Sequence, residues 1–402
     1  MTKQYILFLC CTILLCHFSF GQQAYERLYP FKKDGLYGFI DSKGKIIVEP
    51  QYHQVGRFSE GLCAVVERKN KESKLGYINH KGELVIGLQY QYYLNDGSDF
   101  SEGRAVVRLN EQSGYINREG EMIFPPTLYK GHPFKGEYAV IEEEYSVRKV
   151  INKKGEILFE PREAYRKQMT QEPRGRQTLY LSDHVSDDAI TFSLTDYSTS
   201  PSTSQSGYFD MDGTIHFLDQ RLFGSFCNGR AKAYNENGTR VGYVNKKGEV
   251  VIPYQFIRGT EFHNGKARVR DAKTKKYGII DTNGRYLIDP KYYYISNYFY
   301  KDDDIILVTN DPHSYDFVTS TGEPLTQAGY NLAADFSEGL ALVKTKEKVH
   351  GFIDKTGKPA FELDFDTPPA FRGGVFKGEL AWVKIDKQFA YINKEGEVVF
   401  RY

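Results

Sequence analysis

Apolar residues in this chain fall in short runs separated by turns of the form Asx-x-x-Gly, where Asx is Asp or Asn. Residues 39–50 are typical, because they are rich in β-branched residues and are divided by the turn Asp41-Ser42-Lys43-Gly44. An Asx side chain at the entry of a turn can bond to a backbone N–H two residues on, and Gly supplies the positive φ at the exit. The pattern predicts a short β-hairpin with a Gly bulge, whose strands we name A and B.

A phrase of the form Gly-aromatic-Ile-Asx-x-x-Gly contains this turn and returns along the whole chain. A second phrase, Phe-x-x-Gly-x-Ala-x-Val, occurs at residues 58–65, 100–107, 262–269 and 336–343 and predicts another strand, C. Successive turn glycines are 35 to 39 residues apart, except for one interval of 58 residues. This period predicts an all-β tandem array of about ten three-stranded meanders of ~36 residues, with strand order C, A, B. The clearest copies have their first Gly and turn Gly at Gly38 and Gly44, Gly76 and Gly82, Gly114 and Gly120, Gly242 and Gly248, Gly278 and Gly284, and Gly351 and Gly357.

The two phrases resemble the WG repeat, the WG-containing β repeat of bacterial proteins, over essentially the whole chain after residue 21. The glycines, the Asx turn and the Phe-Ser-Glu-Gly-Leu-Ala phrase at residues 336–341 match this family. The Trp that names the family should precede the first Gly, and the chain departs from the pattern there. The residues at that position are Tyr37, Leu75, Ser113, Val241, Tyr277 and His350. The resemblance implies divergent WG repeats, and because the family shares no catalytic residues it transfers no active site.

The faces of the predicted sheets indicate how the units are arranged. Strand A carries an aromatic residue on one face and Ile or Val on the other, as in Tyr77 and Ile78, so each small sheet needs a cover on both faces. Neighbouring units are the obvious covers, as in propellers and solenoids. Because ten units exceed the roughly four to eight blades of most propellers, we expect a curved, stacked β superhelix. A propeller-like ring, or rings, is the alternative.

The long interval between Gly155 and Gly213 indicates an insertion, so that the chain divides into four segments. We expect a signal peptide at residues 1–21 and repeats 1–4 at residues 22–161. An insertion with a Ser/Thr-rich loop follows at residues 162–206, and repeats 5–10 occupy residues 207–402. Within the insertion, residues 178–181 and 190–194 could form an extra hairpin.

Residues 1–21 have the composition of a secretory signal. Lys3 supplies a positive start, residues 5–16 form an apolar run, and Ser19 and Gly21 are small residues placed for cleavage. The apolar run is too short to cross ~30 Å of hydrocarbon as a helix, and no long apolar run follows it. We therefore expect export through a cleaved signal peptide, with no transmembrane segment in the mature chain. The product would be periplasmic, on the cell surface or secreted.

Charge and motifs exclude several function classes. The chain has 53 Lys and Arg against 52 Asp and Glu, so its net charge of +1 gives no overall field for nucleic acid. The sequence contains no pair of His at metal-ligand spacing, no Cys-x-x-Cys, no Gly-x-Ser-x-Gly and no Gly-Lys-Ser/Thr phosphate loop. The recurring Asp41 position could be imagined as a metal ligand, but Asn replaces Asp in other copies, which favours a role in the turn. We expect no enzyme, no metal and no cofactor.

Tyrosine supplies the candidate binding residues. Tyr52, Tyr90 and Tyr292 share one repeat position, which predicts a structural role for them. Further tyrosines crowd two of the connections from strand B to strand C. A Tyr side chain combines apolar area with a hydroxyl, so it suits sugar stacking and protein interfaces equally, and packing within the fold is the competing role. The candidates are Tyr92, Tyr93, Tyr293, Tyr294, Tyr298 and Tyr300.

Together these features favour an exported, non-enzymatic repeat scaffold of the cell envelope or exterior. Its expected partner is another envelope or extracellular protein, or a glycan, and not nucleic acid. A carbohydrate-binding or carbohydrate-processing protein that uses the Tyr-rich loops is the first alternative. An envelope structural component is the second.

Overall fold

The structure is a computed structural model that describes residues 27–92, 98–144, 147–169, 177–198, 200, 202–297, 299, 304–326, 329–345, 350–362 and 375–402. Over these residues the chain forms small antiparallel sheets and one helix, α1 (Pro161–Met169). The predicted signal peptide, residues 1–21, lies outside the described residues. The prediction of an all-β tandem repeat fold is confirmed.

The strands of the described residues fall into ten consecutive units. Units 1 to 3 contain β1 (Tyr29–Lys33), β2 (Leu36–Ile40) and β3 (Ile46–Tyr52); β4 (Gln54–Ser59), β5 (Leu62–Lys69), β6 (Glu72–Asn79) and β7 (Leu84–Gln91); and β8 (Ala105–Leu109), β9 (Gln112–Ile116) and β10 (Met122–Leu128). Units 4 to 6 contain β11 (Lys130–Gly131), β12 (Tyr138–Glu144), β13 (Val147–Asn152) and β14 (Ile157–Phe159); β15 (Gln177–Leu181), β16 (Ala189–Asp196), β17 (Thr203–Asp210) and β18 (Ile215–Leu218); and β19 (Arg221–Leu222), β20 (Ala231–Tyr234), β21 (Val241–Val244) and β22 (Val250–Gly259). Units 7 to 10 contain β23 (Lys266–Asp271), β24 (Tyr277–Asp281) and β25 (Tyr286–Tyr292); β26 (Tyr294–Ile295), β27 (Ile305–Asp311) and β28 (Ser314–Thr319); β29 (Leu332–Ala333), β30 (Leu340–Lys344), β31 (His350–Asp354) and β32 (Pro359–Glu362); and β33 (Phe376–Lys377), β34 (Leu380–Ile385), β35 (Gln388–Ile392) and β36 (Val398–Arg401).

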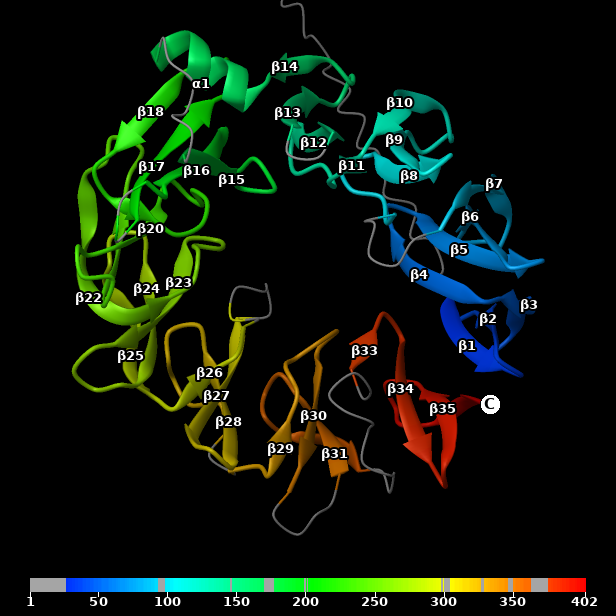
Figure 1. Ribbon diagram of the computed structural model, residues 1–402. Helices are drawn as coiled ribbons and strands as arrows, with labels where there is room; N and C mark the ends of the chain where they lie inside the picture. Colours follow the sequence, from blue (N-terminus) through cyan, green and yellow to red (C-terminus); the bar gives the residue numbers. More distant parts are fainter. Residues whose placement is uncertain are drawn as a thin grey trace, which may run out of the picture.

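Nine of the ten units contain the predicted meander of strands C, A and B, and six of these add a fourth strand. Unit 8 has strands C (β27) and A (β28), with only an isolated bridge between Val318 and Pro324 in place of strand B. In unit 4 the sheet order is β11-β12-β13-β14, so that C (β12), A (β13) and B (β14) are consecutive antiparallel neighbours. The short strand β11 precedes C and comes from the connection that the sequence left without structure. Figure 1 shows β11 and β33 nearer the centre of the molecule than β14 and β25. We call these additional strands the inner strands.

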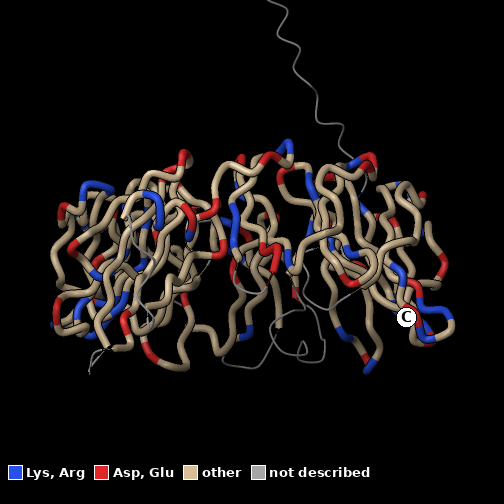
Figure 2. Tube along the Cα trace, turned by 45° about the horizontal axis from the view of Figure 1, so that its top comes forward, with Lys and Arg blue, Asp and Glu red and all other residues tan. Residues whose placement is uncertain are grey.

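The ten units stand side by side in chain order, and the last unit meets the first, so the array is a closed ring (Figure 1). In a view tilted by 45°, Lys and Arg are interspersed among Asp and Glu around the ring (Figure 2). Ten hydrophobic clusters of described residues fill the interfaces, one between each pair of neighbouring units. The tenth cluster joins unit 1 to unit 10 through Tyr29, Phe31, Ile40, Leu380 and Tyr391.

The contacts that close the ring resemble those inside the array. The Tyr391 hydroxyl donates to the Pro30 carbonyl at 2.7 Å, as the Tyr115 hydroxyl donates to the His132 carbonyl at 2.7 Å between units 3 and 4. The Phe31 ring lies edge to face with the Phe400 ring, with 4.9 Å between their centroids. Units 10 and 1 are therefore joined by the same kind of interface that joins neighbouring units elsewhere in the ring.

Of the two arrangements left open by the sequence, the structure has the propeller-like ring, and the preference for an open superhelix is corrected. An open array would leave the apolar face of unit 1, with Phe31, and that of unit 10, with Tyr391, exposed to water. Five of the inner strands are only two residues long, namely β11, β19, β26, β29 and β33, whereas β4 and β15 have six and five residues.

The fifth unit explains the long interval between turn glycines. Helix α1 follows unit 4 and buries Tyr165 in the hydrophobic cluster between units 4 and 5. Strands β15 and β16 pair through Leu181 and Phe192, and β16 pairs in turn with β17. The residues that suggested an extra hairpin therefore form the inner strand and strand C of the fifth unit.

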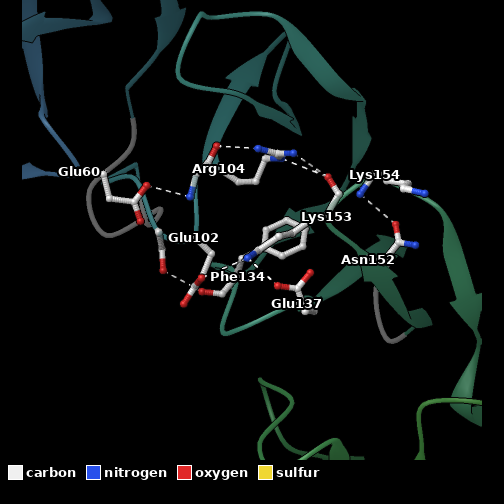
Figure 3. A network of polar contacts seen from close by, with 10 residues as sticks. Glu60, Glu102, Arg104, Phe134, Glu137, Asn152, Lys153 and Lys154 are labelled. Carbon is white, nitrogen blue, oxygen red and sulfur yellow. Dashed lines mark hydrogen bonds and ion pairs between the residues drawn. The ribbon is translucent and has the colours of Figure 1, made fainter. Parts of the chain in front are cut away.

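A polar network runs along one rim of the ring, where the Phe-x-x-Gly turns meet the Asx turns (Figure 3). The Glu60 carboxylate of unit 2 accepts a hydrogen bond from the Gly103 N–H of unit 3 at 2.8 Å. The Arg104 guanidinium of unit 3 donates to the Lys153 carbonyl of unit 4 at 3.0 and 3.1 Å. The Lys153 ammonium lies 2.9 Å from Glu137 and 3.2 Å from Glu102. These bonds tie each turn to the turn of the next unit.

Replacing Arg104 by Met should lower the free energy of unfolding by about 1 to 3 kcal/mol, because the Lys153 carbonyl loses its donor. The guanidinium also donates to the carbonyl of Gly103 at 2.9 Å. Met has no donor, so the hydrogen bonds to the Lys153 carbonyl and to the Gly103 carbonyl are both lost. The measurement is chemical denaturation of the two proteins. The control is Lys154→Met on the same turn. Because the Lys154 side chain is exposed, this change should alter the free energy of unfolding by less than about 0.5 kcal/mol. Equal stability of both variants would contradict the role given to Arg104.

Candidate functional site

The structure separates the sequence-predicted tyrosines. Tyr293 and Tyr294 are exposed by 52% and 38%, at the start of unit 8. Tyr92 is partly buried and packs against the hydrophobic cluster between units 2 and 3, which gives it a packing role. Tyr93, Tyr298 and Tyr300 lie outside the described residues.

The tyrosines that share a repeat position are buried opposite the residue that precedes the first Gly. Tyr90 pairs with Leu75 and is 3% exposed, and Tyr292 pairs with Tyr277 and is 4% exposed. Tyr52 pairs with Tyr37 in the same way. An aromatic side chain on strand B thus stands beside the position where the family pattern has Trp.

Tyr293 and Tyr294 line a hollow of about 910 Å³ on the inner side of the ring. Tyr315 of unit 8 contributes a third aromatic side chain, and Leu307 and Phe336 contribute apolar surface. The charged residues in the lining come from three other units: Arg57 from β4, Asp335 from unit 9 and Lys377 from β33. These residues are up to 320 positions apart in sequence, and only the closed ring brings them together.

The hollow also contains a hydroxyl without a partner. Thr309 is 3% exposed, lines the hollow, and its Oγ1 makes no hydrogen bond. Its strand partner is Tyr294, so the hydroxyl lies beside one of the exposed tyrosines. A buried hydroxyl without a partner costs about 1 to 3 kcal/mol, a cost that a hydrogen-bonding ligand would remove.

A second hollow, of about 940 Å³, adjoins the first at the seam between units 10 and 1. Its lining is more aromatic and includes Tyr37, Trp382 and Phe389. The two hollows have Arg57 and Lys377 in common. An extended ligand could therefore contact both.

The remaining candidate chemistry has structural roles in the described residues. The Asp41 carboxylate accepts hydrogen bonds from the backbone N–H groups of Lys43 and Lys45, both at 2.9 Å. Cys63 and Cys227 are both free. Burial, with Asp99 nearby, raises the pKa of the Cys63 thiol to about 12, and burial also raises the pKa of Cys227, so neither is activated as a thiolate. The part of the chain that the structure describes brings together no group of three or more His, Cys, Asp or Glu side chains able to hold a metal ion.

Sequence reasoning missed Arg57, Thr309, Tyr315 and Lys377. Arg57 and Thr309 belong to neither repeated phrase. Lys377 lies in Phe376-Lys377-Gly378, a shortened copy of the second phrase, and Tyr315 precedes Asp316, which replaces the first Gly of a degenerate copy, but neither position signals binding. All four residues lie on the inner side of the ring, and they meet there only because the ring closes.

Among the described residues, no helix is long and apolar enough to span a membrane.

The ring of stacked antiparallel sheets and its inner hollow define a propeller-like β-repeat protein. A family model described as "WG containing repeat" matches residues 37–71, 76–112, 114–145, 242–272, 277–311, 317–348 and 351–388. These matches cover more than half of the chain, and the protein belongs to the WG-repeat family. The predicted family is thereby confirmed. The fifth unit, with its helix and long strands, lies in the stretch that the family model does not match.

The solved structures matched by this chain have low sequence identity and low TM-scores. BamB from Moraxella catarrhalis is 12% identical, with 53% of this chain and 70% of that chain covered and a TM-score of 0.30. KlHsv2 with loop 6CD replaced by a Gly-Ser linker is 11% identical, with coverages of 63% and 89% and a TM-score of 0.31. The tricorn protease is 13% identical, with coverages of 93% and 39% and a TM-score of 0.22. No curated protein matches this chain significantly.

Proposed function

We propose that this chain is an exported, non-enzymatic repeat scaffold that binds a partner of the cell envelope or exterior in its inner hollow. The observation that supports binding is the hollow itself, where two exposed tyrosines stand beside the partnerless hydroxyl of Thr309. Exposed aromatic side chains and unsatisfied buried polar groups both gain free energy when a ligand covers them. The composition of residues 1–21 supports export.

A glycan is the second candidate for the partner, beside a protein. Tyr293 and Tyr294 offer flat apolar rings with hydroxyls, as sugar recognition requires, and Thr309 adds a hydroxyl. The three charged residues of the lining stand among these groups and could bond to sugar hydroxyls.

The double variant Tyr293→Ala/Tyr294→Ala of tagged residues 22–402 should lose its partner. Wild type and variant are used as bait against native envelope and culture fractions, and the retained protein or polysaccharide is identified. We expect one partner at near-stoichiometric yield with the wild type and at least about tenfold less with the variant, because two aromatic contacts of about 1 kcal/mol each are removed.

The export part of the proposal has its own measurement. Mass spectrometry of the native product should show a chain without residues 1–21.

The matched control is Tyr129→Ala, which removes a tyrosine that is also 52% exposed but lies in unit 4. This variant should retain the partner as the wild type does. Retention by the double variant would move the binding site away from the hollow, and a native product that still carries residues 1–21 would argue against export through a cleaved signal.

A further inference from the structure

The segment from β22 of unit 6 to β25 of unit 7 is basic, although the whole chain is nearly neutral. Residues 250–292 contain nine Lys and Arg against four Asp and Glu, whereas the whole chain contains 53 against 52. None of these nine cations forms an ion pair with another described residue. The nine are Arg258, Lys266, Arg268, Arg270, Lys273, Lys275, Lys276, Arg285 and Lys291.

Several of these cations are held against tyrosine rings. The Arg268 guanidinium lies 5.4 Å from the ring centroid of Tyr277 and 5.6 Å from that of Tyr294. Arg270 lies 5.7 Å from Tyr277. The ring faces and the guanidinium planes alternate, so apolar and cationic surfaces are interleaved. Together with Lys276 and Tyr293, which are 5.3 Å apart, these residues form what we call the Arg–Tyr strip.

Backbone carbonyls orient both guanidiniums of the strip without neutralising them. Arg268 donates to the Ile295 carbonyl of unit 8, and Arg270 donates to the Lys275 carbonyl at 2.8 Å. A carbonyl occupies a donor but carries no formal charge, so each guanidinium keeps its positive charge and its remaining donors. Side chains that are ordered in this way lose less entropy when a carboxylate binds.

The Arg–Tyr strip continues into the hollow. Tyr293 and Tyr294 belong to both, and Thr309, with its partnerless hydroxyl, is the strand partner of Tyr294. Anionic groups are favoured at one end of this surface and hydroxyl groups at the other. A polymer that fits both ends carries negative charges, flat apolar faces and many hydroxyls.

We propose that the Arg–Tyr strip and the adjoining hollow bind an acidic polysaccharide, which is a more specific form of the proposed function and rests on it. Its carboxylates pair with Arg268 and Arg270, since guanidinium and carboxylate match in a bidentate geometry. Its sugar rings stack on Tyr293 and Tyr294, and a sugar hydroxyl bonds to Thr309. Single-stranded nucleic acid also combines charge with stacking. The Thr309 hydroxyl and the Asp335 carboxylate in the hollow favour the polysaccharide, because both can bond to the many hydroxyls of sugar rings, and a nucleic acid ligand is therefore one arm of the test.

The test measures the affinity of residues 22–402 for oligogalacturonate, an acidic oligosaccharide, and for a neutral galacto-oligosaccharide of equal length, by calorimetry. The wild type should prefer the acidic ligand, and its affinity should fall as salt is raised. Arg268→Gln/Arg270→Gln should weaken binding of the acidic ligand about tenfold, since two cationic contacts of about 0.7 kcal/mol each are lost. If this double variant unfolds, Lys276→Gln, in the exposed turn between β23 and β24, tests the positive charge of the same strip, with an expected loss of affinity of about threefold.

The matched control is Arg108→Gln. Arg108 of unit 3 has the register position of Arg270, because Arg108 pairs with Ser113 as Arg270 pairs with Tyr277. It lies in another part of the ring, and the partner at its side is Ser instead of Tyr. This variant should bind the acidic ligand as the wild type does.

Three results would overturn the proposal: equal affinity for the acidic and neutral ligands, no effect of the Arg268→Gln/Arg270→Gln change, or tighter binding of oligothymidylate than of oligogalacturonate. If the neutral ligand or a captured protein still binds and depends on Tyr293 and Tyr294, the proposed function stands while the acidic polysaccharide is excluded. If nothing binds in either experiment, both proposals fail.

Discussion

Replacing Phe31 by Ala should weaken the closure of the ring and lower the free energy of unfolding by about 3 to 5 kcal/mol. Phe31 is 1% exposed and fills the interface between units 1 and 10, against the rings of Phe400 at 4.9 Å and Tyr402 at 5.9 Å. This interface is the only one that joins the two ends of the described chain. Amide hydrogen exchange should therefore show lost protection in β1, β2 and β34 to β36, while the other units remain protected.

The matched control is Phe134→Ala, which removes an equally buried ring from the interface between units 3 and 4. The control should lose a similar free energy of unfolding, but its loss of protection should fall on β8 to β13. A second variant, Tyr391→Phe, removes only the hydroxyl that donates to Pro30 and should cost about 1 kcal/mol. If Phe31→Ala left the exchange of β34 to β36 unchanged, the contact between the chain ends would not be a stable interface.

Replacing Gly76 by Ala should lower the free energy of unfolding by about 2 to 3 kcal/mol, because the new methyl group has no space. Gly76 is the first Gly of the second repeat, and strand β7 bulges over it, since Leu75 pairs with Tyr90 while Tyr77 pairs with Ile86. A Cβ on Gly76 would lie 2.6 Å from the carbonyl oxygen of Ile86. The obstacle is backbone, which cannot turn aside as a flexible side chain would. Thermal and chemical denaturation measure the loss.

The matched control lies on the opposite strand of the same bulge. A Cβ on Gly87 would have no atom within 4 Å, and its φ is not in the left-handed region. Gly87→Ala should therefore be neutral or stabilise the fold by up to about 1 kcal/mol, because Ala restricts the unfolded chain. An equal loss in both variants would show that the two positions are limited by backbone freedom instead of by the bulge.

These two predictions also show where the sequence was informative. The recurrence of Gly76 and its equivalents was visible in the sequence, but the bulge that requires Gly there was not, because it depends on how strand B pairs with strand A. The same limit applies to the candidate site. Tyr293 and Tyr294 were predicted from the surplus of tyrosines in one connection. Thr309 lies in no motif, and Tyr315 occupies the position before the degenerate first Gly, Asp316, which carries no signal for binding. Tyr92 was chosen for the same reason as Tyr293, and its packing against the core became evident only from its neighbours.

The sequence by itself determined the repeat, the order of strands C, A and B, the Asx turns and the family of this protein. Each of these is set by interactions between residues close in sequence, such as the bonds from the Asp41 side chain to the backbone of the same turn. Only the tertiary structure decided that the array closes, and with it the hollow that joins Arg57 to Tyr315 and Lys377. Closure depends on the sum of the small rotations at all the interfaces between units. A change of a few degrees at each would open the ring, and no local pattern of residues fixes an angle so finely.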